Sequence, residues 1–302
     1  MLAGGKLPVL QNGPHTSEAI AFAEPTMVLD EIYKKNRAIE GAVLKFRRDR
    51  VPVALSLIVF TVQLAAWYWL PLAGAIATGI LLLPFLGSCA IFNHHQQHHN
   101  AFNSRVLNRL WEVILGTQTM ITSYAWVLHH NFGHHPHYLN QPPCPSNIED
   151  ESRWARRNGS LMGRTEYTLN LMLRAPFDSV RVGLHRRREL LWFTLMMIPY
   201  LALQLLLAWV NWQNYLAVFL VPSSLMLTYV YWLTYEHHSG LHTDNPYAGS
   251  RNRVGRLYNL RAFNLGYHTA HHIKPYIHWS LLPAYHELIK DKIPPECYVK
   301  CR

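Results

Sequence analysis

Cysteine is scarce in this chain of 302 residues, which contains four: Cys89, Cys144, Cys297 and Cys301. Their spacing provides no regular disulfide framework, which argues against a fold built on disulfide bonds. Cys297 and Cys301 could ligate a metal, but two thiols without further partners are better interpreted as free thiols. No secretory signal precedes the first apolar segment, which begins at Val51 after a polar and charged stretch.

Charged residues are absent from four long segments, although the mean hydropathy of the whole chain is close to zero. Each segment has about 20 residues, the length that a helix needs to cross a hydrocarbon core of about 30 Å. Helices in the core of a soluble protein rarely run so far without charge. The sequence therefore predicts four membrane-spanning helices, at residues 51–70, 72–92, 191–210 and 215–235.

Acidic residues are outnumbered, 18 against 28 basic ones, and the formal net charge is +10. The basic residues precede the first apolar segment, fill the region between the second and third, and follow the fourth. The connections around residue 71 and at 211–214 contain no Lys or Arg. By the positive-inside rule, both termini and the long middle region are expected in the cytoplasm. The membrane thus accounts for the basic balance, and no element suggests a nucleic-acid partner.

The rest of the chain divides around these segments. Residues 1–50 are expected to form a cytoplasmic N-terminal segment that is mobile over its first 30 residues, and residues 51–302 a single membrane domain. Residues 107–128 are apolar but include Arg109 and Glu112, which favours an interfacial or re-entrant helix over a fifth span. Residues 150–189 are Arg-rich and predict an amphipathic helix on the membrane surface.

Histidine is abundant, and its distribution is the most informative feature of the sequence. Sixteen of the 19 histidines fall in four clusters, at residues 94–99, 129–137, 237–242 and 268–278. Each cluster follows or lies beside an apolar segment, and the expected topology puts all four on the same side of the membrane. Imidazole is a common ligand for iron, zinc and copper, and one ion takes three or four such ligands. The number of histidines therefore indicates two metal ions.

The spacing within each cluster suits ligands presented by helices. Residues three or four apart share a helix face, so His94 and His98 can act together. The second cluster contains His130-x3-His134-His135 and the fourth contains His268-x2-His271-His272. In each motif the first two histidines can share a face while the adjacent third points to a neighbouring ion. Each ligand also needs an acceptor for its other ring nitrogen. Among five nearby candidates we favour Glu236; the others are Asp150, Glu151, Asp244 and Asn264.

These motifs resemble the histidine boxes of the membrane-bound fatty acid desaturases and their hydroxylase relatives, including alkane hydroxylases. The first box is His94-x3-His98, and the second is Trp126 followed by His130-Asn131-Phe132-Gly133-His134-His135. The third box runs from Asn264 to His272 and is followed by Pro275, Leu282 and Pro283. An additional histidine lies in the Glu-His-x-Gly context of residues 236–240. The resemblance extends over about residues 51–287.

The resemblance implies an all-α integral membrane fold, with four spanning helices and a cytoplasmic helical cap that holds two iron ions. It implies nine metal ligands: His94, His98, His130, His134, His135, His238, His268, His271 and His272. Two clusters contain more histidines than the family pattern needs, so His95 and His99 compete with His94 and His98, and His237 and His242 with His238. His129, His137 and His278 are interpreted as supporting or surface groups. Residue types alone would also admit zinc, manganese or copper.

The function that the resemblance implies is the O2-dependent oxidation of a lipophilic substrate, with desaturation of a fatty acyl chain as the first choice. Hydroxylation of an alkyl or lipid chain and ketolation of a carotenoid are the alternatives. A metal transporter would place ionisable residues within the spans, which are free of charge. An intramembrane zinc protease would need H-E-x-x-H, which is absent.

No electron carrier is fused to the chain, so a separate ferredoxin, rubredoxin or cytochrome is expected as the electron donor. Two sets of arginines, Arg186–Arg188 and Arg251 to Arg261, favour an acidic donor, although contact with anionic lipid and a role in topology are the simpler explanation. Near the end of the fourth span, four aromatic residues could line a substrate pocket or form an interfacial belt: Tyr229, Tyr231, Trp232 and Tyr235.

Overall fold

The computed structural model describes residues 30, 33–34, 42–144 and 148–299. Over these residues the chain is helical, with three isolated β-bridges and no strand. The expectation for residues 1–50 falls largely outside them. The helices of four or more residues are α2 (Arg50–Trp69), α3 (Leu72–His98), α4 (Arg105–Thr119), η2 (Val127–His134), α5 (Arg164–Leu184), α6 (Arg187–Val210), α7 (Trp212–Tyr215), η3 (Leu216–Leu220), α8 (Val221–His238), α9 (Arg256–Arg261), α10 (His268–Ile273) and α11 (Leu282–Ile289). The short turns η1 (Arg47–Asp49), η4 (Trp279–Leu281), η5 (Lys290–Lys292) and η6 (Pro295–Cys297) complete the list.

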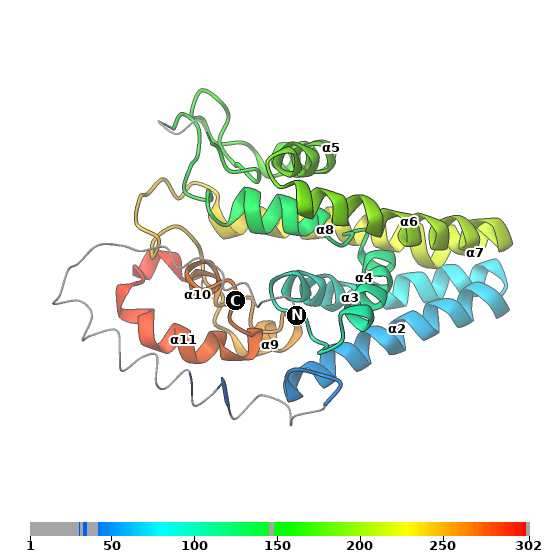
Figure 1. The fold of residues 1–302 in the computed structure, drawn as a ribbon. Coiled ribbons are helices and arrows are strands. Elements are labelled where there is room, and N and C mark those ends of the chain that lie inside the picture. The colour runs from blue at the N-terminus through cyan, green and yellow to red at the C-terminus, as the bar shows by residue number, and fades with distance from the viewer. Residues whose placement is uncertain (1–29, 31–32, 35–41, 145–147, 300–302) are drawn as a thin grey trace, which may run out of the picture.

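Among the described residues, four helices are long and apolar enough to cross a membrane, which confirms the number of spans predicted. They cover Arg47–Trp69, Leu72–His98, Arg187–Val210 and Trp212–His238, and they run side by side (Figure 1). All four are longer than predicted, and the second and fourth continue at their C-terminal ends beyond the apolar residues into the histidine clusters. One continuous helix therefore connects the apolar bundle to the histidines at residues 94–98, and another to those at 237–238.

Apolar side chains cover the outside of the bundle, as lipid contact requires. The clearest case is α6, where Ile198 and Leu205 are among the exposed residues and Trp209 is 85% exposed. Inside the bundle, polar side chains satisfy backbone groups. Gln63 Nε2 donates to the Val218 carbonyl at 2.7 Å, and Asn214 Nδ2 donates to the Leu70 carbonyl at 2.8 Å. These hydrogen bonds tie the α2–α3 hairpin to the turn between α6 and α8.

Two helices were expected outside the spans, at residues 107–128 and 150–189, and the structure agrees with these expectations to different degrees. Helix α4 is too short to span, and it packs against α3, α6 and α8. In the Arg-rich middle region only Arg164–Leu184 is helical, because residues 150–163 form an irregular segment with one bridge between Ala155 and Leu161. Helix α5 is seen nearly end-on in Figure 1, across the direction of α6 and α8. One face of α5 packs into the core. The other face exposes a row of apolar side chains, formed by Leu169, Leu173, Phe177, Val180 and Leu184.

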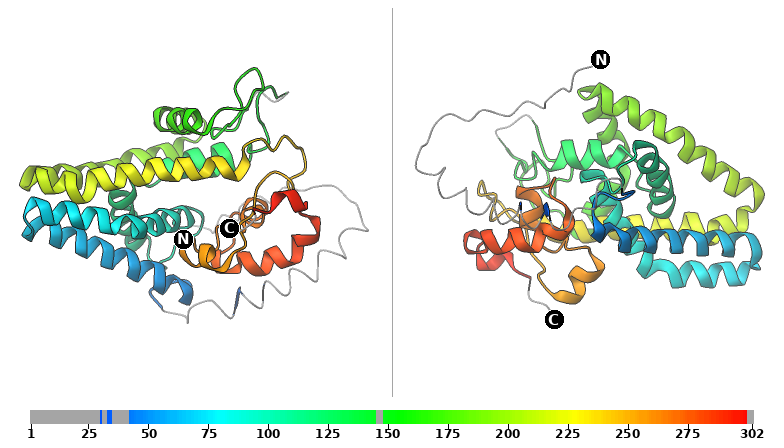
Figure 2. Two further views of the ribbon diagram at one scale, coloured as in Figure 1. Left: turned by 180° about the vertical axis from the view of Figure 1, so that it is seen from behind. Right: turned by 60° about the horizontal axis from the view of Figure 1, so that its bottom comes forward.

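Helices α9, α10 and α11 gather at one end of the four long helices, the end at which α3 and α8 finish (Figures 1 and 2). Their core includes Ala270, Leu282 and Ile289. A second contact anchors this C-terminal region to the start of α2. The buried Asp49 carboxylate accepts from His278 Nε2 at 2.9 Å and from Trp279 Nε1 at 2.8 Å. The C-terminal region thus covers the ends of the helices that carry the first and third clusters.

Candidate metal centre

Four elements deliver histidines to one buried region. Helix α3 contributes its last turn, η2 and the residue after it contribute the second box, α8 contributes its C-terminal residue, and α10 contributes the third box. The nine histidines named from the sequence all lie there, and the structure divides them into two adjacent groups. Each group draws its members from more than two elements, so the site forms only when the bundle and the C-terminal region are both in place.

The first group contains five histidines whose ligand atoms all lie within 4.8 Å of one another: His94, His98, His130, His135 and His271. The Nε2 atoms of His94 and His271 are 2.9 Å apart, and those of His130 and His135 are 3.0 Å apart. Two imidazole nitrogens that share an ion at about 2.1 Å lie roughly 3.0 to 3.4 Å apart in octahedral or tetrahedral geometry. The spacing of this group therefore fits one metal ion.

The second group contains His134, His238 and His272, again with ligand atoms within 4.8 Å of one another. His268 joins them, because its Nε2 lies 3.1 Å from that of His238 and 3.2 Å from that of His272. Four imidazoles thus converge on a second position beside the first. The rings of His135 and His272 are 4.4 Å apart between centroids, which makes the two groups immediate neighbours.

Buried surroundings favour the neutral form, which binds metal, in five of these histidines. Burial lowers the pKa of His130, His135 and His271 well below the usual value, and neighbouring histidines lower it further. The same causes act on His268 and His272. Gathering so many buried imidazoles without an ion would leave ring nitrogens unsatisfied, as both nitrogens of His98 are. This pattern fits metal ligation better than a hydrogen-bonded core.

The pairing of histidines within the boxes differs from the one expected. In the second box His130 pairs with His135, because Val127–His134 is a π-helix in which the His135 N–H donates to the His130 carbonyl at 2.9 Å. A π turn places residues five apart on one face. In α10, His268 pairs with His272 at the ordinary spacing of four. His134 and His271 are therefore the members of each box that cross to the other group.

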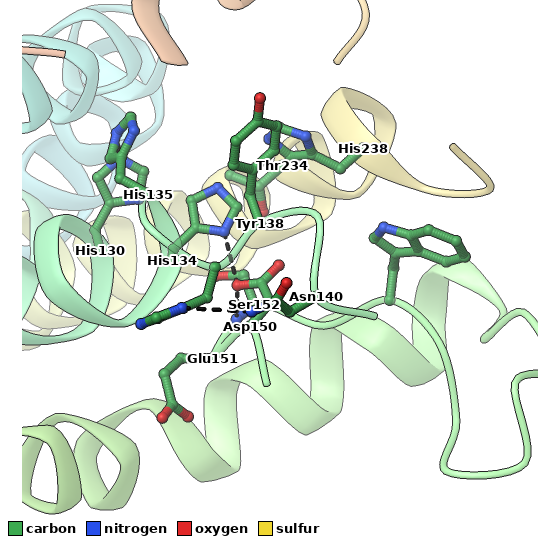
Figure 3. Close-up of polar contacts among 12 residues, drawn as sticks. His130, His134, His135, Tyr138, Asn140, Asp150, Glu151, Ser152, Thr234 and His238 are labelled. Atoms are coloured by element: carbon green, nitrogen blue, oxygen red, sulfur yellow. Dashed lines mark hydrogen bonds and ion pairs between the residues drawn. The ribbon is translucent and has the colours of Figure 1, made fainter. Parts of the chain in front are cut away.

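The supporting carboxylate is Asp150, and the preference for Glu236 was wrong. His134 Nδ1 lies 2.8 Å from Asp150 Oδ1, as Figure 3 shows, and Asp150 is fully buried. Gln141 Nε2 donates to the other carboxylate oxygen at 2.9 Å. Glu236 instead forms ion pairs with Arg164 and Arg253. Nothing in the local sequence around Gln141 indicated this role.

The competing histidines lie outside both groups. His95 on α3 and His99, the residue after α3, belong to neither group, and the ring of His99 packs edge-on against Phe46 and His278. The ring of His237 packs at a tilt against that of His268, with 4.0 Å between their centroids, and His242 packs against Trp154. His278 is buried and paired with Asp49, a contact between residues 229 positions apart that no sequence pattern revealed.

A narrow, largely apolar cavity of about 70 Å³ lies against the histidines of both groups. A second cavity of about 250 Å³, between α5, α6 and α8, shares Trp126, His129 and Tyr231 with it. Of the four aromatic residues near the end of α8, Tyr231 lines both cavities. Tyr229 and Trp232 are exposed, and Tyr235 donates to the Met162 carbonyl at 2.7 Å. The remaining walls come from α3 and α5, at Ala90 and Leu171 among others.

The family model for fatty acid desaturases matches residues 45–300. The chain belongs to the fatty acid desaturase family. No curated protein and no solved structure matches it. Membership makes the protein an oxidoreductase of membranes, in agreement with its four apolar helices. Desaturases of this family use two iron ions, and the two histidine groups fit a pair of ions in number and spacing. Imidazole alone does not select iron over zinc.

Proposed function

We propose that the protein is an O2-dependent, di-iron oxidase that desaturates the alkyl chain of a lipophilic substrate, with a fatty acyl group as the first choice. The observation that carries this proposal is the position of the two histidine groups, side by side at the end of an apolar cavity. In this proposal one ion is held by His94, His98, His130, His135 and His271. The other is held by the second group: His134, His238, His268 and His272.

The bound iron pair would supply the oxidising chemistry that removes hydrogen from an unactivated C–H bond. The protein's own residues position the substrate and exclude water. Ile91, Leu171 and Val230 give the cavity walls that accept an alkyl chain. Trp126 packs between the cavity and the first group, with its ring centroid 4.9 Å from that of His130. Asp150 fixes the orientation of His134, so that its Nε2 faces the second group.

Product analysis of the iron-reconstituted protein tests this function. The protein would be supplied with a chemical reductant, O2 and a fatty acyl lipid, and the products would be identified by mass spectrometry. A product with two hydrogens fewer supports desaturation. A product with an added hydroxyl oxygen would make the protein a hydroxylase, and an oxidised ring from a carotenoid substrate would make it a ketolase. Activity with zinc as the only metal would contradict the proposal.

Paired variants test the site. His94→Ala and His271→Ala should each lose bound iron and turnover, whereas His95→Ala should retain iron because its ring lies outside both groups. Iron per chain, measured by elemental analysis, separates loss of the metal from loss of substrate. Equal iron loss in His94→Ala and His95→Ala would overturn the assignment within the doubled first cluster.

We further propose that the histidine groups and both termini face the cytoplasm. The basic residues before α2 and α6 lie at the end of the bundle that carries the histidines, while the turns between α2 and α3 and between α6 and α7 contain no Lys or Arg. A separate acidic electron donor would then reach the site from the cytoplasm. Arg251 donates to the backbone carbonyl of Glu236, and Arg253 pairs with the Glu236 carboxylate. Arg256 and Arg261 are exposed. Arg256 and Arg261 are therefore the better positions for charge reversal, with salt-sensitive turnover as the readout.

A further inference from the structure

A basic groove lies behind the second histidine box, on the side away from the cavity. It is enclosed by η2, the segment 149–157 and the junction of α5 with α6, and it has a volume of about 700 Å³, a size typical of ligand sites. Ser152 lines the cavity, whereas Glu151 and Arg153 line the groove, so the two spaces lie on opposite sides of one segment. Figure 3 shows Glu151 pointing toward α5 and away from His134.

The groove carries surplus positive charge. Its lining includes four arginines and two glutamates. The arginines are Arg153, Arg157, Arg181 and Arg186, and the glutamates are Glu149 and Glu151. Arg153 lies 3.2 Å from Glu149, and Arg181 pairs with Glu151 and with Asp178. Arg157 and Arg186 have no acidic partner within 4.0 Å among the residues that the structure describes. Two guanidinium groups are thus available to an anion.

One of these two is already held in position. The guanidinium of Arg186 lies over the ring of Phe132 at 4.5 Å from its centroid. Stacking on a ring fixes the plane of the group and leaves its N–H donors free at the edge, where they can bind phosphate oxygens as a pair. A compact phosphate ester therefore suits the groove better than a lone carboxylate.

The surroundings of the groove are those of a membrane interface. Arg186 directly precedes α6, one of the four candidate spans. On α5, Phe177 is 75% exposed and Leu184 is 62% exposed, and Arg181 lies between them in the sequence and lines the groove. An amphipathic helix with an exposed apolar row lies in the plane of a bilayer surface. A ligand with a phosphate in the groove would thus find apolar surface for its chains directly beside it.

We propose that this groove binds the phosphate headgroup of an anionic phospholipid from the surrounding bilayer. The site is separate from the metal centre and does not depend on the proposed reaction. Binding would brace the contact between segment 149–157 and η2, where the Glu151 N–H donates to the Gly133 carbonyl at 3.2 Å. The lipid would therefore stabilise the part of the protein that holds His134 and Asp150.

The test uses the full-length protein in detergent and short-chain phosphatidylglycerol as the probe, followed by thermal unfolding and native mass spectrometry. Phosphatidylglycerol should raise the unfolding temperature and remain bound, whereas phosphatidylcholine of the same chain length should not. The double variant Arg157→Gln/Arg186→Gln should weaken binding on the order of a hundredfold, or about tenfold for each lost charge-assisted hydrogen bond. Glu151→Gln should tighten binding because it removes negative charge from the groove.

The matched control is Arg187→Gln/Arg188→Gln, two exposed arginines next in sequence that do not line the groove. Normal binding in the control with weakened binding in the groove variant supports the proposal. Equal loss in both would mean general surface charge and would overturn it. An equal shift with glycerol 3-phosphate would mean a site for free phosphate esters. Unchanged lipid binding in the groove variant, with impaired donor-driven turnover, would assign the groove to a protein partner. Both this result and the result with glycerol 3-phosphate would refute a lipid site.

Discussion

At the scale of single residues, the carboxylate of Asp150 is the most consequential group outside the histidines. It is fully buried, it accepts from His134, and its own position is set by Gln141 and by the backbone N–H of Ser152 at 2.8 Å. Such a partner orients a metal ligand and raises its basicity. The ordering of His134 therefore depends on a loop that contributes no ligand.

Replacing this carboxylate should weaken the metal centre. We expect Asp150→Asn to reduce metal affinity or turnover roughly 10- to 100-fold, the usual cost of losing such a partner. Glu236→Gln is the comparison, because Glu236 pairs with arginines and touches neither histidine group. Iron titration of both purified variants decides the matter, and a larger loss in Glu236→Gln would show that the supporting carboxylate has been misassigned.

Glu151, the neighbour of Asp150, predicts a pH effect on stability. Burial raises its pKa from 4.5 to about 7, although Arg181 acts in the opposite direction. Between these values the folded protein binds more protons than the unfolded chain, so this group lowers the free energy of unfolding as pH rises. Relative to wild type, Glu151→Gln should therefore gain stability from about pH 5 to about pH 8. Thermal unfolding at both pH values measures the difference in stability between the variant and wild type. A difference that is the same at both pH values would contradict the raised pKa of Glu151.

At the scale of elements, the π-helix of the second box decides which histidine goes to which group. A π turn is equivalent to one extra residue within an α-helix. With that residue, His130 and His135 share the first group and His134 reaches the second. In α10, where His268 and His272 are four apart, no extra residue is needed. Two different spacings thus produce the same division of a three-histidine box.

A deletion tests this equivalence. Removing Phe132 should convert η2 into an ordinary α-helix, place His130 four residues from the histidine that is now His135, and retain two metal ions per chain. Inserting an alanine at the same point should break the pairing and lose metal. Elemental analysis of the two variants provides the readout. Complete metal loss on deletion, with helix content unchanged by circular dichroism, would show that the π geometry itself is required.

The sequence predicted the features of these elements that depend on local spacing, and missed those that depend on packing. The four spans follow from the absence of charge. A spacing of four allowed either His94 with His98 or His95 with His99, and only the resemblance to a histidine box favoured the pair that lies in the first group. Hydropathy could not locate the ends of α3 and α8, because both helices continue through polar histidines. The partition of the boxes depends on a π turn, and the contact of Asp49 with His278 joins distant residues. No local sequence pattern indicates the π turn or this contact.

At the scale of the whole molecule, the orientation in the membrane remains a prediction that labelling can test. In a background with the four native cysteines replaced by serine, a cysteine at Trp212 should react with an impermeant thiol reagent in intact cells. A cysteine at Asn158 should react only after the cells are opened. Both positions are exposed, so access within the protein is comparable. The reverse result would place the histidine groups outside the cytoplasm.

Because the histidines come both from the bundle and from the C-terminal region, the fold also sets the order in which the site can be assembled. Helix α10 gives His271 to one group and His268 and His272 to the other, so both groups need residues that follow the fourth span in the sequence. A nascent chain that has inserted all four spans but has not yet added α10 lacks part of each group. Binding of the two proposed ions would therefore come after insertion of the spans and would require the C-terminal region to be packed against the bundle.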